Sequence, residues 1–99
     1  MSNNAFELLQ NWYVKHCDGD WEHEFGVRID TLDNPGWSVV IDLLDTNLDN
    51  KQFTKINRLK TENDWIQCDV KNHKFHGAGG PQNLIDIINA FIEWESSYC

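Results

Sequence analysis

One short segment of the chain concentrates the side chains that could do chemistry. It runs from residue 16 to residue 24 and reads His-Cys-Asp-Gly-Asp-Trp-Glu-His-Glu. Imidazole, thiol and carboxylate groups are the side chains that bind metal ions, attack electrophiles or transfer protons. The segment could therefore hold a metal ion, activate the thiol of Cys17 or present its carboxylates to a partner.

A metal ion is the first possibility, and the spacing of the candidate ligands argues against it. Zinc sites usually contain closely spaced pairs of cysteines or histidines, and the one such pair is His73 and His76. The alternating acids that start at Asp18 resemble the beginning of a calcium loop. However, His23 replaces the glycine of its sixth position and Ile29 replaces the glutamate of its twelfth. We therefore predict no metal site and no other cofactor.

Nucleophilic catalysis by Cys17 is the second possibility. A reactive cysteine needs cations or a helix N-terminus to stabilise its thiolate, whereas Cys17 follows the expected end of a helix and precedes four acidic residues. We therefore expect a half-buried, small apolar side chain and predict no catalytic residues. The alternative is a small enzyme, either sulfurtransferase-like or a metal-dependent hydrolase, that uses the region of Cys17 and His23.

The stretch Gly77-Ala78-Gly79-Gly80-Pro81 could be taken for a phosphate-binding loop. It lacks the Lys-Ser/Thr pair of a P-loop and does not match the G-x-G-x-x-G fingerprint. We predict a flexible connection over residues 71–81.

The charge of the chain is concentrated in its first half. The net charge is -8, and residues 1–50 hold ten acidic and two basic residues, whereas residues 51–99 hold six of each. Such a field repels nucleic acid and anionic membranes and suits a cationic protein. The predicted partner-binding residues are four acids and one aromatic anchor of the segment: Asp18, Asp20, Trp21, Glu22 and Glu24. The alternative is that the acids only keep the protein soluble, while Asp18 and Asp20 hydrogen-bond their own turn.

Helices are expected at the two ends of the chain, and a hairpin is expected between them. Apolar residues at helical spacing predict helices over about residues 4–16 and 83–95. Two alternating runs on either side of Asp-Asn-Pro-Gly, residues 33–36, predict an antiparallel hairpin over about residues 25–43. Residues 45–51 have a loop composition.

Two further strands complete the predicted sheet. Residues 52–60 favour a strand weakly, and the alternation of residues 66–70 favours another. The expected fold is α+β: a single domain over residues 1–99 with an antiparallel meander sheet of about four strands. Both terminal helices should pack on one face of that sheet.

Aromatic residues and cysteines complete the expectations. Trp12 and Trp94 fit core-facing positions, whereas Trp21 and Trp65 are expected to be exposed anchors. The odd set of three cysteines, with no basic or apolar leader at the N-terminus, favours a reduced, cytoplasmic protein without a membrane span.

Two motifs resemble a known family. Residues 13–23 read YVKHCDGDWEH and residues 31–37 read TLDNPGW; a later Gly-Gly-Pro-x-Asn-Leu and the Phe-x-x-Trp of residues 91–94 agree in spacing. Together they resemble the immunity protein 53 family, small immunity proteins of bacterial polymorphic toxin systems, over nearly the whole chain. Some relatives carry a sulfurtransferase label, which the acids after Cys17 disfavour. The resemblance implies a protein that binds a cognate toxin domain and blocks it inside the producing cell, and the acidic first half of the chain would suit a cationic nuclease as that toxin.

Overall fold

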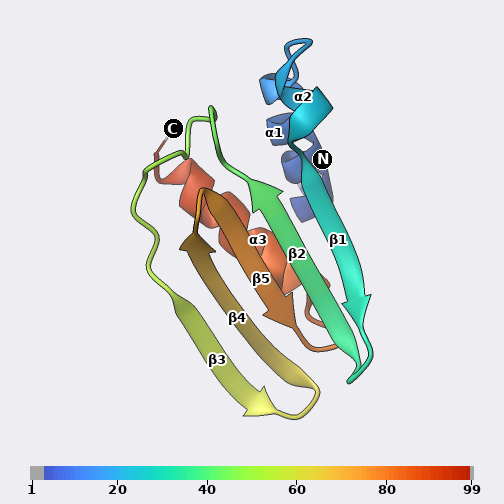
Figure 1. Ribbon diagram of the computed structural model, residues 1–99. Helices are drawn as coiled ribbons and strands as arrows, with labels where there is room; N and C mark the ends of the chain where they lie inside the picture. The colour runs from blue at the N-terminus through green and yellow to red at the C-terminus, as the bar shows by residue number, and fades with distance from the viewer. Residues whose placement is uncertain (1–3, 99) are drawn as a thin grey trace.

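The computed structural model describes residues 4–98, and these fold into one sheet with helices on one side of it (Figure 1). The helices are α1 (Ala5–His16), α2 (Trp21–Glu24) and α3 (Leu84–Ser96), and the strands are β1 (Val27–Leu32), β2 (Gly36–Asp42), β3 (Ile56–Thr61), β4 (Asp64–Lys71) and β5 (Lys74–Gly79). Among the described helices, none is long and apolar enough to cross a bilayer.

The predicted hairpin is confirmed. β1 and β2 pair in antiparallel register from Val27 opposite Ile41 to Leu32 opposite Gly36. The turn between them contains Pro35, which presets its own φ and cannot donate to a ladder. β1 begins at Val27, later than expected, because the preceding Phe25 ends the helical turn of α2.

The sheet contains five strands in the order β1-β2-β5-β4-β3, and every neighbouring pair is antiparallel. The α+β class is therefore confirmed, with five strands where about four were predicted. The additional strand is β5. It lies between β2 and β4 and joins the hairpin of the first half to the β3-β4 hairpin of the second (Figure 1).

The prediction of a flexible connection over residues 71–81 is wrong, because β5 occupies the centre of the sheet. Its glycines reflect close packing. A Cβ atom on Gly77 would lie 2.4 Å from Cγ2 of Ile87, and one on Gly79 would lie 3.0 Å from Cδ1 of the same residue. These glycines let α3 approach the sheet, so a composition typical of loops belongs here to a buried strand.

Both predicted terminal helices are confirmed, and they share one side of the sheet. Asn4 caps α1 by accepting a hydrogen bond from the backbone N–H of Glu7 (2.8 Å). α3 packs on β2, β4 and β5, and α1 packs on α3. The core between these layers contains Trp12 and Trp94, as predicted, together with fully buried Phe75 and Phe91.

The loop between β2 and β3 is long, and hydrogen bonds from three tryptophan side chains join it to the helices. The N–H of Trp12 donates to the Asn47 side chain (3.0 Å), that of Trp21 to the carbonyl of Leu44 (2.8 Å), and that of Trp94 to the carbonyl of Gln52 (2.7 Å). Leu48 is fully buried. The predicted loop at residues 45–51 is confirmed, and the strand expected from residue 52 begins at residue 56.

Candidate functional site

The acidic segment folds into a tight loop, residues 17–20, followed by the single turn of α2. The carboxylate of Asp18 accepts hydrogen bonds from the backbone N–H groups of Asp20 (2.9 Å) and Trp21 (3.0 Å). The carboxylate of Glu22 accepts hydrogen bonds from the backbone N–H groups of Asp18 (2.9 Å) and Gly19 (2.8 Å). These two side chains therefore fix the loop and the start of α2, as short polar side chains do in turns and caps.

The same hydrogen bonds keep both carboxylates charged. The backbone N–H groups of Trp21 and Asp20 lower the pKa of Asp18 below its usual range. The pKa of Glu22 is lowered by its own backbone N–H and, against the opposing effect of burial, by those of Asp18 and Gly19. Both acids are therefore negative at neutral pH while their oxygens bind the chain's own backbone.

The prediction that Trp21 is exposed is wrong. Its side chain is 5% exposed, and its ring lies 6.1 Å from that of Trp12 in an edge-on arrangement. α2 turns the indole inward, where its N–H finds the carbonyl of Leu44. Because α2 is a single turn, its inward face has no repeating pattern in the sequence. Trp65, the other expected anchor, is half-buried on β4.

A depression of about 480 Å³ gathers the acids at this end of the molecule. Its lining includes Asp18, Asp20, Glu24 and Asp45, together with Lys15 and His16. We call this the acidic depression. Asp45 belongs to the loop between β2 and β3 and was not among the predicted site residues. Nothing near it in the sequence connects it to the others; the hydrogen bond between Trp21 and the neighbouring Leu44 brings it there.

The residues considered for catalysis have ordinary structural partners or are open to solvent. The thiol of Cys17 donates to the backbone carbonyl of Tyr13 (3.3 Å), and the side chain is half-buried, as expected. His23 is exposed. His16 lies 3.2 Å from the Asn47 side-chain oxygen, and burial lowers its pKa. Within residues 4–98, no three or more His, Cys, Asp or Glu side chains are grouped so as to hold a metal ion.

The two described cysteines are free thiols. Cys68 is buried on β4 beside Gly77 of β5, and burial raises its pKa to about 11. A thiol of this kind is a poor nucleophile at neutral pH. Cys99, the third cysteine of the sequence, lies outside the described residues.

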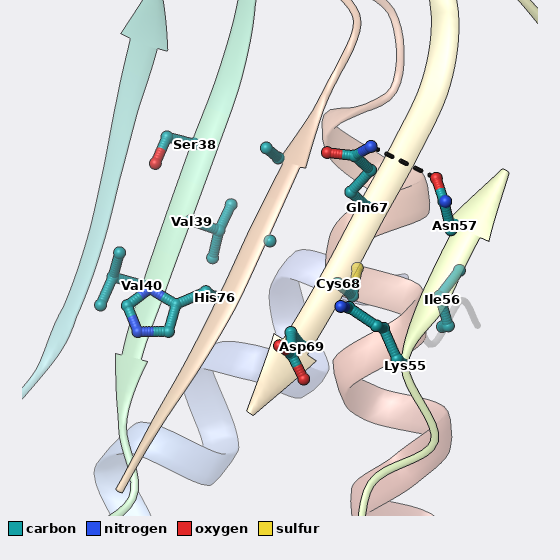
Figure 2. A pocket seen from close by; sticks show the side chains of 12 residues that line it. Ser38, Val39, Val40, Lys55, Ile56, Asn57, Gln67, Cys68, Asp69 and His76 are labelled. Carbon is teal, nitrogen blue, oxygen red and sulfur yellow. Dashed lines mark hydrogen bonds between the residues drawn. The ribbon is translucent and has the colours of Figure 1, made fainter. Parts of the chain in front are cut away.

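A second hollow, of about 430 Å³, lies on the face of the sheet opposite α3 (Figure 2). The register places the polar side chains of this open face in rows across the strands. One row contains Val40, His76 and Asp69, and the next contains Ser38, Ala78, Gln67 and Asn57. The amide of Gln67 donates to Asn57 (3.2 Å), as Figure 2 shows.

The residues of this hollow do not form a connected hydrolytic triad. Ser38, Asp69 and His76 are the residue types of a hydrolytic triad, but Ser38 lies one row away from the other two. No hydrogen bond joins any two of the three in the described structure, although a triad needs each member to hold the next. The sequence did not reveal this surface, because residues 71–81 were expected to be a loop and His76 was therefore assigned to no sheet.

A buried carboxylate on β2 links this strand to β1 and β5 at the end of the sheet nearer the acidic depression. Asp42 is 1% exposed and accepts hydrogen bonds from the backbone N–H of Gly26 (2.9 Å) and from the ammonium group of Lys74. The guanidinium of Arg28 lies 3.7 Å from it. Burial alone would raise the pKa of Asp42, but the hydrogen bonds and the two positive charges outweigh burial, and the pKa lies below its usual range.

Comparison with known proteins identifies the family. Immunity protein 53 matches residues 6–96, a range that includes both quoted motifs, the acidic depression and the whole sheet. No curated protein and no solved structure matches the chain. The match covers nearly the entire chain, as the resemblance of its motifs implied. The chain belongs to the immunity protein 53 family.

Proposed function

We propose that this protein binds a cognate toxin domain inside the producing cell and blocks its activity, with the acidic depression as the first point of recognition. Family membership over residues 6–96 is the observation that carries the proposal. An immunity protein must hold one partner tightly and needs no turnover of its own. The partner would therefore be a protein domain, and the net charge of -8 disfavours nucleic acid and anionic membranes as partners.

The arrangement of the acids supports two different roles within the predicted site. The carboxylate oxygens of Asp18 and Glu22 accept hydrogen bonds from the chain's own backbone N–H groups. Asp20 and Glu24 are exposed and line the depression with Asp45. We assign direct charge contacts to these three, and a positioning role to Asp18, Glu22 and the buried Trp21.

A cationic partner suits this end of the molecule. Nuclease domains are cationic where they hold nucleic acid, and an acidic surface can occupy such a groove and block it. Complementary charges also speed the encounter of the two proteins. Speed matters here, because a toxin made in the same cell has to be captured before it reaches its target.

Co-expression tests the proposal. The C-terminal domain encoded directly upstream of this chain's gene would be produced in a host with and without the immunity chain, and growth would be measured. Restored growth together with co-purification of the two proteins is expected. Growth arrest despite a folded, expressed immunity chain would contradict the proposal.

A Cys17→Ser variant in the same assay separates binding from catalysis. A serine hydroxyl can keep the hydrogen bond to Tyr13, so the fold should persist. Protection within a few-fold of the parent is expected if the protein acts by binding. Sulfurtransferase activity that is lost together with protection in this variant would favour the enzyme instead.

A further inference from the structure

The outer edge of β1 offers backbone groups that can pair with another strand. β1 is a terminal strand of the sheet. Gly26, just before β1, uses both of its backbone groups toward β2: its carbonyl accepts from the N–H of Asp42 (3.0 Å), and its N–H donates to the Asp42 carboxylate. Antiparallel pairing alternates from residue to residue. The N–H and C=O groups of Val27, Ile29 and Thr31 therefore point away from β2, toward the outside of the sheet.

A groove runs beside the first half of this edge. It has a volume of about 560 Å³ and lies between α1, α2 and β1. Its lining includes Phe6, Tyr13, Phe25 and Val27 as apolar contacts and Glu22, Glu24 and Arg28 as charges, and we call it the β1 groove. Phe6 remains 45% exposed although it belongs to the apolar stripe of α1, and Ile29 is 37% exposed on the same side of β1.

The two edges of the sheet differ in how they resist pairing. β3 carries Arg58 and Lys60, and its register with β4 shifts between Leu59 and Thr61. Basic side chains and irregular register are devices by which natural edge strands avoid unwanted partners. β1 pairs regularly over six residues and contains no proline and no register shift. Its one basic residue, Arg28, lies 3.7 Å from the Asp42 carboxylate, which balances its charge. Of the two edges, β1 is therefore the less protected one.

Charge selects the kind of segment that fits. Glu22 and Glu24 stand at the α2 end of the β1 groove, and Glu24 also lines the acidic depression. A cationic segment is attracted to Glu22 and Glu24, because the charge of Arg28 on β1 is balanced by Asp42. Arg58 and Lys60 repel such a segment from β3. A second copy of this chain is disfavoured as the occupant, because its net charge of -8 would be repelled by Glu22 and Glu24.

We propose that the toxin domain adds an extended segment to β1 as a sixth strand of the sheet. Every second side chain of that segment is apolar and enters the β1 groove against Phe6 and Tyr13. Lysine or arginine side chains lie at the end near Glu22 and Glu24. Main-chain hydrogen bonds to Val27, Ile29 and Thr31 supply affinity, and the groove supplies selectivity. This inference rests on the proposed function, since the segment belongs to the toxin.

Hydrogen exchange of the complex tests it residue by residue. The probe is the upstream-encoded toxin domain, mixed with the full immunity chain, and backbone amide exchange is read by NMR. The amides of Val27, Ile29 and Thr31 should exchange at least about tenfold more slowly in the complex. The amides of Arg28 and Asp30 already face β2 and should change little.

A matched pair of variants removes one donor at a time. Thr31→Pro deletes an outward N–H and leaves the β1-β2 ladder intact, because proline is tolerated where the N–H faces solvent. Thr31→Ala keeps the N–H. We expect toxin binding to weaken about tenfold or more in Thr31→Pro and to stay within about twofold in Thr31→Ala. An equal melting temperature for the two variants serves as the folding control.

The outcomes separate the two proposals. A complex whose Val27, Ile29 and Thr31 amides stay unprotected, or that tolerates Thr31→Pro as well as Thr31→Ala, overturns the sixth strand and leaves the proposed function standing. Failure of the two proteins to form a complex overturns both. Concentration-dependent dimers of the immunity chain alone, with the same three amides protected, would make a second copy the occupant and also overturn the inference.

Discussion

Asp42 is the charged residue whose removal should cost the most stability. Its carboxylate satisfies the N–H of Gly26 and balances Lys74 and Arg28 at a position that solvent scarcely reaches. Both basic side chains are partly exposed and can turn to water when Asp42 is gone. The loss therefore falls below that of a fully buried ion pair.

We predict that Asp42→Ala lowers the free energy of unfolding by about 2 kcal/mol at pH 7. The pKa of Asp42 is lowered in the folded state, so its contribution is fully present above the ordinary value of 3.8 and is lost as the pH falls through the folded pKa. Urea unfolding at pH 7 and under acid conditions measures both effects. Asp30→Ala, an exposed acid of β1, is the control and should change little. A constant difference between Asp42→Ala and the parent down to the most acidic pH would contradict this assignment.

For individual residues, the sequence could predict the chemistry of a side chain better than the direction in which it points. The alternative that Asp18 bonds its own turn was available from its residue type, since Asp does so in many turns. The burial of Trp21 was not, because it depends on a four-residue helix and on a carbonyl 23 positions away. Long-range hydrogen bonds of this kind leave no local pattern.

Among the elements, β5 depends most on one small residue. Gly77 faces α3, and Ile87 fills the space in which a side chain would stand. Phe75 also lies close, 3.2 Å from the position of the added Cβ atom. Both neighbours are fully buried and have little room to move.

We predict that Gly77→Ala destabilises the protein by about 1–3 kcal/mol through overpacking. Replacing Ile87 by Leu removes the offending Cγ2 branch at similar volume, so Gly77→Ala with Ile87→Leu should recover part of the loss. Thermal unfolding of the single and double variants measures this. Gly26→Ala is the control, since its added Cβ would approach only the ring of Tyr13, at 4.0 Å. Equal losses for Gly77→Ala and Gly26→Ala would argue against close packing as the role of Gly77.

The contrast between β5 and the β1-β2 hairpin explains what the sequence could yield about elements. Two alternating runs and a turn that contains Pro35 and Gly36 predict the hairpin. β5 alternates as well, but two of its core-facing positions are Gly77 and Gly79, which carry no apolar signal. Its glycines matter only once α3 is packed against the sheet, and that contact joins segments that a local pattern cannot relate.

For the molecule as a whole, the uneven charge should govern how fast it meets its partner. The acids of the depression come from the loop of residues 17–20, from α2 and from the distant loop between β2 and β3, and they add to a net charge of -8. Charges at the rim of an interface act mainly on association and are screened by salt. The total charge and its bias toward the first half were predictable from composition. The meeting of Asp45 with Asp20 and Glu24 required the fold.

We predict that the double variant Asp20→Asn with Glu24→Gln binds the toxin domain about two- to tenfold more slowly at low salt and shows a flatter salt dependence. Surface plasmon resonance at low and high ionic strength measures the association rate. The control variant, Glu62→Gln with Glu93→Gln, removes the same charge from exposed positions in the second half of the chain. If both double variants slow association equally, net charge and not the acidic depression governs the encounter.

The position of β5 also has a consequence for protein synthesis. The hairpin β1-β2 leaves the ribosome well before β5, so its inner edge stays unpaired until β5 can be inserted beside β2. α3, which covers the same strands, is made later still. Pairing of such distant segments is slow compared with local folding. A half-made chain therefore cannot complete its sheet, and the proposed binding of a toxin would have to wait until β5 and α3 have been made.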